Sequence, residues 1–398
     1  MPTNPRGQRR KYHISQRANQ ISPSGIRRFF DLLASMEGVI SLGVGEPDFT
    51  TPWHITKAAI ESLEKGQTMY TSNLGMPELR QELSRHLKNH YSLEYDAGSE
   101  LLITVGVSEA LDLAMRAILD LGDEVIMPDP CYVSYEPCVV LAGGTPVMVP
   151  TNEGNSFEIS AADFEVRITN KTKAILIGYP ANPTGAVTSR GKLAEIVEVA
   201  RRHQLLVVSD EIYAKLVYGV EHTCVATLPG MQAHTILLGG FSKAYAMTGW
   251  RVGYTAAPKE IIAAMTKIHQ YTMMCAPTMA QVAAIEALKS GEDSATEMVE
   301  DYNRRRLVIV KGLCDIGLPC FEPKGAFYAF PSIKPTGMTS EEFAEKLLTE
   351  EKVAVVPGSA FGQYGEGYVR CCYATSLADI EEALVRMKRF VDRHHKET

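Results

Sequence analysis

Between about residues 100 and 260, short apolar runs alternate with longer stretches in which apolar residues recur at helical spacing. The helical spacing is clear at Ser108–Leu119 and Lys192–His203. This alternation is typical of β-α-β units and predicts a mainly parallel sheet flanked by helices. The runs that we interpret as strands are Leu101–Val105, Glu124–Met127, Pro146–Val149, Ala174–Gly178, Leu205–Ser209, Thr235–Leu238 and Val252–Ala256.

The pattern changes near Ser290–Asp293, where the composition turns polar. A long charged helix is expected to follow toward Gly312, and we interpret its triplet Arg304-Arg305-Arg306 as a solvated face. The runs beyond it predict a smaller α+β domain, with strands at Phe327–Phe330, Val353–Val356 and Gly367–Tyr373 and helices at Ser340–Leu348 and Leu377–Arg393. We therefore expect an N-terminal arm with part of the small domain (1–50), a large α/β domain (51–295) and a small C-terminal domain (296–398).

Composition is that of a globular enzyme. Of the 398 residues, 45% are hydrophobic and 22% charged, and the formal net charge is −7. This charge argues against a nucleic-acid surface, and no apolar run is long enough to cross a membrane. The basic N-terminal stretch lacks the apolar segment of a secretory signal. The eight cysteines show no metal-ligand spacing, and the adjacent Cys371 and Cys372 are expected to be buried thiols, so we expect no metal and a cytoplasmic location.

Polar clusters follow three of the predicted strands. Asn182-Pro183-Thr184-Gly185 comes after Ala174–Gly178, and Asp210 to Tyr213 comes after Leu205–Ser209. Ser242-Lys243 comes after Thr235–Leu238, in a run of small residues with Arg251 eight positions on. Each cluster alone has an ordinary structural explanation, such as a turn or a helix cap. Ligands gather at the carboxyl ends of parallel strands, however, and a lysine in such a place can form a Schiff base with a carbonyl.

A fourth element is the turn at Gly106-Val107-Ser108, where a strand passes into a helix. The free N–H groups of a helix start would suit a phosphate, but Ser108 as an ordinary N-cap fits the same pattern. The glycines at 43 and 45 lack the third glycine of a dinucleotide fingerprint, so a nicotinamide enzyme is disfavoured.

A reactive lysine, an acid, an Asn, a Tyr and an anion cradle with an arginine suit pyridoxal 5′-phosphate (PLP). At this point the sequence resembles the class I/II aminotransferases of the fold-type-I PLP family, from about Ile40 to the C-terminus. The resemblance is carried by four motifs: Gly-Phe-Ser-Lys-x-x-Ala-Met-x-Gly-x-Arg at 240–251, Asn-Pro-Thr-Gly at 182–185, Ser-Asp-Glu-x-Tyr at 209–213 and Tyr-Val-Arg at 368–370.

The resemblance implies a role for each matching residue around the cofactor ring. Lys243 would hold PLP as an internal aldimine and carry the proton between Cα and C4′. Asp210 would pair with the pyridinium nitrogen, so that the ring acts as an electron sink. Tyr213 and Asn182 would hydrogen-bond the ring oxygen. Tyr132 would stack on the ring, where many relatives carry Trp.

The resemblance also implies contacts to the phosphate and to the substrate. The phosphate would be held by the turn Gly106, Val107 and Ser108 together with Ser242 and Arg251. Tyr70 would reach the phosphate of the neighbouring subunit in a homodimer, although an ordinary core aromatic would suit the same sequence. Arg370 would clamp the substrate α-carboxylate, with Gly45, Asn182 and Tyr132 beside it.

The expected reaction is a ping-pong transamination between an L-amino acid and an oxo acid such as 2-oxoglutarate. Aromatic substrates are favoured and aspartate is the alternative, because Arg370 accounts for only one carboxylate. Two other functions are compatible with the motifs: a PLP-dependent C–S β-lyase or another PLP enzyme of the same fold, and a non-catalytic ligand-sensing domain of a regulator. The entry segment 21–26 would line the pocket or simply start a helix.

Overall fold

The computed structural model describes residues 14–22 and 36–394. Its centre is a seven-stranded sheet in the order β2-β8-β7-β6-β5-β3-β4. The five strands from β7 to β4 are parallel, whereas β8 runs antiparallel to both of its neighbours. The bounds are β2 Leu101–Thr104, β3 Glu124–Asp129, β4 Thr145–Pro150, β5 Thr172–Gly178, β6 Leu206–Asp210, β7 Thr235–Gly240 and β8 Gly253–Ala256. The mainly parallel sheet is confirmed, with each predicted strand present within two residues of its expected ends.

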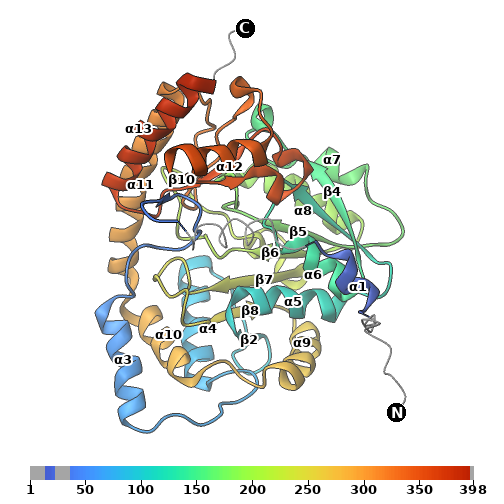
Figure 1. The fold of residues 1–398 in the computed structure, drawn as a ribbon. Coiled ribbons are helices and arrows are strands. Elements are labelled where there is room, and N and C mark those ends of the chain that lie inside the picture. The colour runs from blue at the N-terminus through green and yellow to red at the C-terminus, as the bar shows by residue number, and fades with distance from the viewer. Residues whose placement is uncertain (1–13, 23–35, 395–398) are drawn as a thin grey trace, which may run out of the picture.

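Helices cover both faces of this sheet (Figure 1). Successive strand residues point to opposite faces, so Val125 and Met127 pack in one apolar cluster and Ile126 packs in another. The helices around the sheet are α3 Trp53–Glu64, α4 Pro77–Tyr91, α5 Gly106–Ile118, α6 Tyr135–Ala142, α7 Ala161–Glu165, α8 Arg190–Arg202, α9 Lys259–Thr272 and α10 Thr278–Ser290, with α1 Gln16–Gln20 against α6. No helix in the described part of the chain is both long and apolar enough to span a membrane.

A smaller body is built from the last third of the chain and one early strand. Its helices are α11 Glu292–Asp315, α12 Ser340–Glu351 and α13 Leu377–His394. An antiparallel sheet has the order β11-β12-β9, with bounds Val356–Pro357, Val369–Cys372 and Tyr328–Ala329. The early strand β1 Ile40–Ser41 pairs in parallel with β10 Val353–Ala354. The domain limits at 50 and 295 stay a prediction, and the second falls in the first turn of α11.

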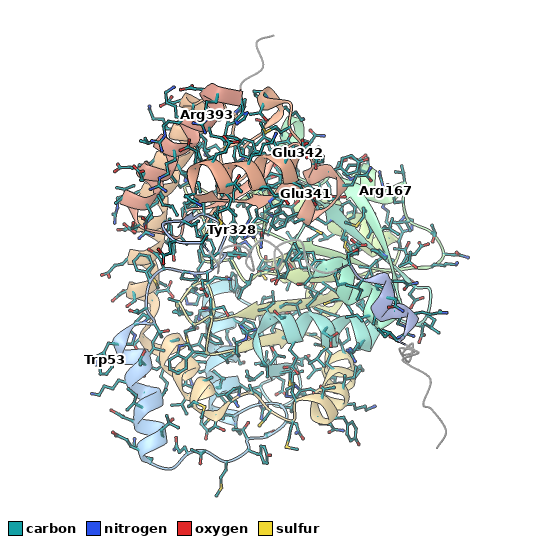
Figure 2. The ribbon with its side chains drawn as sticks, viewed as in Figure 1. Trp53, Arg167, Tyr328, Glu341, Glu342 and Arg393 are labelled. Atoms are coloured by element: carbon teal, nitrogen blue, oxygen red, sulfur yellow. The ribbon has the colours of Figure 1, made fainter. Side chains whose placement is uncertain are left out.

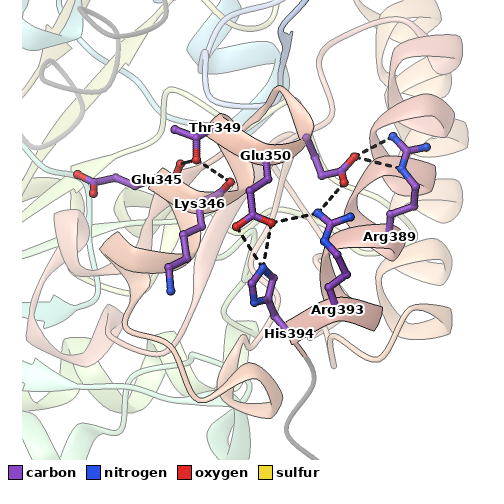
Figure 3. Close-up of polar contacts among 8 residues, drawn as sticks. Glu345, Lys346, Thr349, Glu350, Arg389, Arg393 and His394 are labelled. Atoms are coloured by element: carbon purple, nitrogen blue, oxygen red, sulfur yellow. Dashed lines mark hydrogen bonds and ion pairs between the residues drawn. The ribbon is translucent and has the colours of Figure 1, made fainter.

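Ion pairs join the last two helices of the small body (Figure 3). Glu351, at the end of α12, is buried and accepts two hydrogen bonds from Arg389 at 3.1 and 2.8 Å. Arg393 contacts both Glu351 and Glu350, at 2.7 and 3.0 Å. These arginines follow each other by one helical turn on α13, so one face of that helix is fixed to the end of α12.

Two expectations for this region are wrong. The run Val353–Val356 is not one strand but two, because β10 pairs with β1 while β11 pairs with β12. The arginine triplet is not a solvated face: only Arg304 is exposed, while Arg305 and Arg306 are 8% and 6% exposed. Arg305 binds both carboxylate oxygens of Asp48 at 2.8 Å. Carboxylates that tertiary packing brings from elsewhere in the chain decide this outcome, and helical periodicity does not reveal them.

The remaining expectations concern single side chains and the N-terminus. Cys371 and Cys372 are buried free thiols, as expected. The basic stretch at residues 6–11 and most of the segment 21–26 lie outside the described residues.

Candidate active site

A cavity of about 600 Å³ opens at the carboxyl ends of β5, β6 and β7. These three strands are neighbours in the sheet, so the three polar clusters of the sequence meet at one edge. The predicted residues that line the cavity are Gly45, Val107, Ser108, Tyr132, Asn182, Asp210, Tyr213, Ser242, Lys243, Arg251 and Arg370. Gly106 and Tyr70 are not among the lining residues, although Gly106 precedes Val107 and lies beside Arg251.

The Lys243 amine lies on the cavity, and no carboxylate of the described residues is within ion-pair distance of it. Its Nζ donates a hydrogen bond of 2.6 Å to the carbonyl oxygen of Gly45. It also lies 5.8 Å from the ring centre of Tyr213 and 5.7 Å from that of Phe327. Burial lowers the pKa of Lys243 to about 8, and the nearby guanidinium groups of Arg370 and Arg251 act in the same direction. About a tenth of this amine is therefore neutral and nucleophilic at pH 7, far more than for an ordinary lysine.

Asp210, the last residue of β6, is a buried carboxylate on the same cavity. Its Oδ2 accepts a hydrogen bond from the Tyr135 hydroxyl at 3.0 Å, and its Oδ1 accepts one from the Ile212 N–H at 3.2 Å. Burial raises the pKa of Asp210 to about 6, although both hydrogen bonds and the Lys243 cation oppose that rise. The carboxylate can thus pair with a cationic ring nitrogen that enters the cavity.

Arg370, in β12, reaches the cavity from the small body. Its Nη1 donates to Asn182 Oδ1 at 2.9 Å and its Nη2 donates to the carbonyl of Gly43 at 2.7 Å. The guanidinium lies 4.4 Å from the ring centre of Tyr328 and 4.9 Å from that of Phe361. Its buried Nε has no hydrogen-bond partner in the described part of the chain. A planar cation held in this way presents its fork to a carboxylate.

The start of α5 forms a second wall. Gly106 has φ +74°, and a Cβ at this position would lie 2.7 Å from Nη2 of Arg251. The helix begins at Gly106 with Val105 as N-cap, so Ser108 is inside the first turn and is not the cap. The first N–H groups of a helix have no partners within it, and here they lie beside the Arg251 cation. This wall suits an anion such as a phosphate.

Tyr70 is 80% exposed, which excludes the interpretation as a core aromatic. It does not line the cavity of its own chain.

Among the lining residues that the sequence did not predict are two tyrosines, Tyr135 and Tyr328. Tyr135 contacts Asp210, and Tyr328 contacts Tyr213 through hydroxyl oxygens 2.7 Å apart. Tyr328 lies where the small body meets the central sheet (Figure 2). Tyr135 stands three residues after the predicted Tyr132, and the Tyr135 N–H donates to the Tyr132 carbonyl in a turn that brings the two rings together. For Tyr328 the sequence holds no comparable signal, since its partner is more than 100 residues away.

The sheet, the strand-end cavity and its lysine define a fold-type-I aminotransferase. The profile of the family "Aminotransferase class I and II" matches residues 37–387, and the chain belongs to this family. It is 58% identical to "Putative aminotransferase YugH" of Bacillus subtilis, over 97% of this chain and 99% of the relative. It is 48% identical to "Aspartate aminotransferase" of Pyrococcus abyssi, over 94% and 97% of the two chains.

A solved structure resembles the fold closely. The aromatic aminotransferase from Pyrococcus horikoshii superposes with a TM-score of 0.88 and 46% identity, covering 92% of this chain and 99% of that one. Together with the matches along nearly the whole chain, this structure identifies the protein as an enzyme with aminotransferase activity.

Proposed function

We propose that the chain is a PLP-dependent aminotransferase that moves the amino group of an L-amino acid to an oxo acid such as 2-oxoglutarate, in a ping-pong cycle. The observation that carries the proposal is the union, on one cavity, of a partly neutral lysine, a buried acid and an oriented arginine: Lys243, Asp210 and Arg370.

The residues present fit PLP. The start of α5 with Gly106, Val107 and Ser108, together with Ser242 and Arg251, would hold the phosphate, because a Cβ at Gly106 would occupy the space beside the Arg251 guanidinium. Asp210 would bind the ring nitrogen, Tyr132 would cover the ring, and Lys243 would hold the aldehyde carbon. Tyr213 and Asn182 would bind the ring oxygen, since both offer polar groups to the same cavity.

The bound cofactor would supply an electron sink for the charge left when the substrate loses its α-proton. The chain supplies the rest. Arg370 binds the α-carboxylate, with Asn182 and the backbone of Gly45 beside it, and so orients Cα toward Lys243. The Lys243 amine takes the proton from Cα and returns it at C4′, which its lowered pKa permits. Tyr213 donates its hydroxyl proton in a hydrogen bond to the ring oxygen.

We favour aromatic substrates and keep aspartate as the alternative. The cationic side chains that line the cavity are Lys243, Arg251 and Arg370, and each has a role in the proposal above. Within residues 14–22 and 36–394, none of the lining residues thus supplies a spare cation for a second carboxylate. The ring of Tyr328 and the side chain of Leu111 are apolar surfaces that suit an aromatic side chain. The relatives named above include both an aspartate and an aromatic aminotransferase.

We also propose a homodimer in which Tyr70 completes the site of the partner subunit. Its support is an exposed apolar patch, formed by Met69, Tyr70, Tyr271, Met273 and Met274. The Met69 carbonyl accepts from Thr278 Oγ1 at 2.7 Å and the Met274 carbonyl accepts from Asn73 Nδ2 at 2.8 Å, so the patch is built on a fixed backbone. An ordered apolar patch of this kind is typical of an interface. A cytoplasmic location is proposed as well, in keeping with eight free cysteines.

A half-reaction screen tests the proposal. The enzyme loaded with PLP is mixed with one amino acid at a time, without an oxo acid, and the absorbance of the lysine-bound cofactor is followed. We expect a full, rapid loss with tyrosine or phenylalanine and restoration by 2-oxoglutarate. Fast reaction with aspartate alone would overturn the aromatic preference, and release of pyruvate and ammonia from a cysteine conjugate would favour a β-lyase. Lys243→Ala should still bind PLP but lose almost all turnover.

A further inference from the structure

Tyr135 is the buried neighbour of Asp210. It is the first residue of α6, its side chain is 4% exposed, and its hydroxyl donates to Asp210 Oδ2 at 3.0 Å. The remaining carboxylate oxygen accepts from the Ile212 backbone, so each oxygen of Asp210 has one protein partner. Of these two partners, only the Tyr135 hydroxyl can be removed by changing a side chain.

The fold leaves room for this hydroxyl at one strand position. Gly178, at the end of β5, is the register partner of Asp210 in β6. A Cβ at Gly178 would lie 2.1 Å from the Tyr135 hydroxyl oxygen, well inside contact distance. The absence of a side chain at 178 is therefore what lets the tyrosine reach across the end of β5 to the carboxylate.

The Tyr135 ring also supports the face of the cavity. Its centre lies 5.6 Å from that of Tyr132 at an interplanar angle of 83°, an edge-to-face contact. Tyr132 and Asp210 line the same cavity on different elements, and Tyr135 touches both. Tyr135 thus contacts both Tyr132, proposed to stack on the cofactor ring, and Asp210, proposed to bind the ring nitrogen.

The hydrogen bond from Tyr135 affects the charge state of Asp210. Burial alone favours the neutral form of Asp210, whereas a hydroxyl donor favours the anion. Burial and the nearby Asp210 charge raise the pKa of Tyr135 well above its ordinary value, so the hydroxyl keeps its proton and remains a donor.

We propose that Tyr135 is a positioning residue that holds the Asp210 carboxylate as an oriented anion facing the ring nitrogen of the cofactor. The proposal rests on the PLP function proposed above. It adds a residue that does not itself touch the ring nitrogen but determines the state of the group that does.

The test compares two ligands on two forms of the chain. Wild-type and Tyr135→Phe apoenzymes are titrated with PLP and with its 1-deaza analogue, in which carbon replaces the ring nitrogen. The phenylalanine ring keeps the contact with Tyr132, so only the hydroxyl is lost. We expect PLP to bind about tenfold more weakly to Tyr135→Phe, the loss of one hydrogen bond to a charged group. The analogue should bind both forms equally, because it offers Asp210 no nitrogen.

The outcomes separate the two proposals. If wild type forms no lysine-bound species with PLP, the proposed function fails. If wild type binds PLP normally and Tyr135→Phe matches it, or if the variant loses equal affinity for both ligands, the positioning role is refuted. Tyr179→Phe is the matched control: it removes another buried hydroxyl, which bonds the Phe157 carbonyl at 3.2 Å, and should leave both affinities unchanged.

Discussion

The phenolic oxygens of Tyr213 and Tyr328 lie 2.7 Å apart and link the large sheet to the small body. Tyr213 follows β6, whereas Tyr328 is in β9 and has its ring face against the Arg370 guanidinium. The hydroxyl and the ring of Tyr328 therefore serve different neighbours. The hydroxyl contacts Tyr213, which is proposed to bind the cofactor, and the ring contacts Arg370, which is proposed to bind the substrate carboxylate.

This division predicts different losses in two variants at position 328. Tyr328→Phe should change KM for the amino acid less than about threefold, because the ring under Arg370 remains. It should also shift the pH at which the bound cofactor changes colour, because the Tyr213 hydroxyl loses its hydrogen-bond partner 2.7 Å away. Tyr328→Leu should in addition raise KM clearly. Spectra across pH and steady-state kinetics measure both effects, and equal KM values in the two variants would contradict the assignment.

The lowered pKa of Lys243 predicts how fast the cofactor-free chain captures PLP. Only the neutral amine attacks an aldehyde, so the capture rate should rise as pH increases through about 8, the folded-state pKa of this lysine. Stopped-flow absorbance between pH 6 and 10 gives the midpoint. Arg370→Met removes one of the cations that lower the pKa, so its midpoint should lie higher. A capture rate that does not vary between pH 6 and 9 would contradict the lowered pKa of Lys243.

The contacts of Arg370 predict that even a conservative substitution there lowers activity strongly. Arg370→Lys keeps the charge but cannot donate to Asn182, Gly43 and a substrate carboxylate from one planar group. We expect kcat/KM to fall about 100-fold, or ~3 kcal/mol, chiefly through the amino-acid KM. Arg116→Lys, in an exposed ion pair with Asp112, is the control and should retain wild-type kinetics. An unchanged KM in Arg370→Lys would refute the carboxylate role.

The proposed homodimer predicts complementation between two inactive variants. Lys243→Ala lacks the amine, and Tyr70→Ala should bind PLP weakly at both sites of its own dimer. Refolded together, they form mixed dimers with one site that has both residues, so activity at low PLP should reappear. Sedimentation should show a dimer in each case. Absence of recovery in a mixture that demonstrably exchanges subunits would place Tyr70 outside the partner's site.

The ion pairs between α12 and α13 predict a pH-dependent stability. Burial raises the pKa of Glu351, but hydrogen bonds from Arg389 and Arg393 outweigh it and leave the pKa below its ordinary value. Glu351→Gln should cost about 1–2 kcal/mol of unfolding free energy at neutral pH. The difference should disappear as pH falls below the ordinary glutamate pKa of about 4, because the wild-type carboxylate is then lost as well.

Urea denaturation at several pH values measures this difference. Glu382→Gln, in an exposed pair with Arg386, should cost under about 0.5 kcal/mol and serves as the control. A similar loss of unfolding free energy in both variants would mean that the burial of Glu351 does not strengthen its ion pairs.

The sequence predicts the sheet and the convergence of Asn182, Asp210 and Lys243, because parallel strands place their carboxyl ends at one edge. It does not predict contacts that depend on how separate elements pack. Arg305 looks solvated until Asp48 is brought against it from 257 positions away. Tyr328 becomes a cavity residue only when β9 meets the segment after β6. The local sequence pattern predicts where strands and helices form. The hydrogen-bond partners of buried polar groups depend on tertiary packing, which that pattern does not predict.

The pairing of β1 with β10 has a consequence for synthesis of the chain. Ser41 finds its strand partner only at Ala354, about 300 residues later. At roughly 5–20 residues per second, the early strand waits for ~15–60 s on the ribosome before its partner emerges. The large sheet, whose strands lie between residues 101 and 256, can assemble within that interval. The Gly43–Gly45 wall that follows β1, which receives Lys243 and Arg370, is therefore expected to close last.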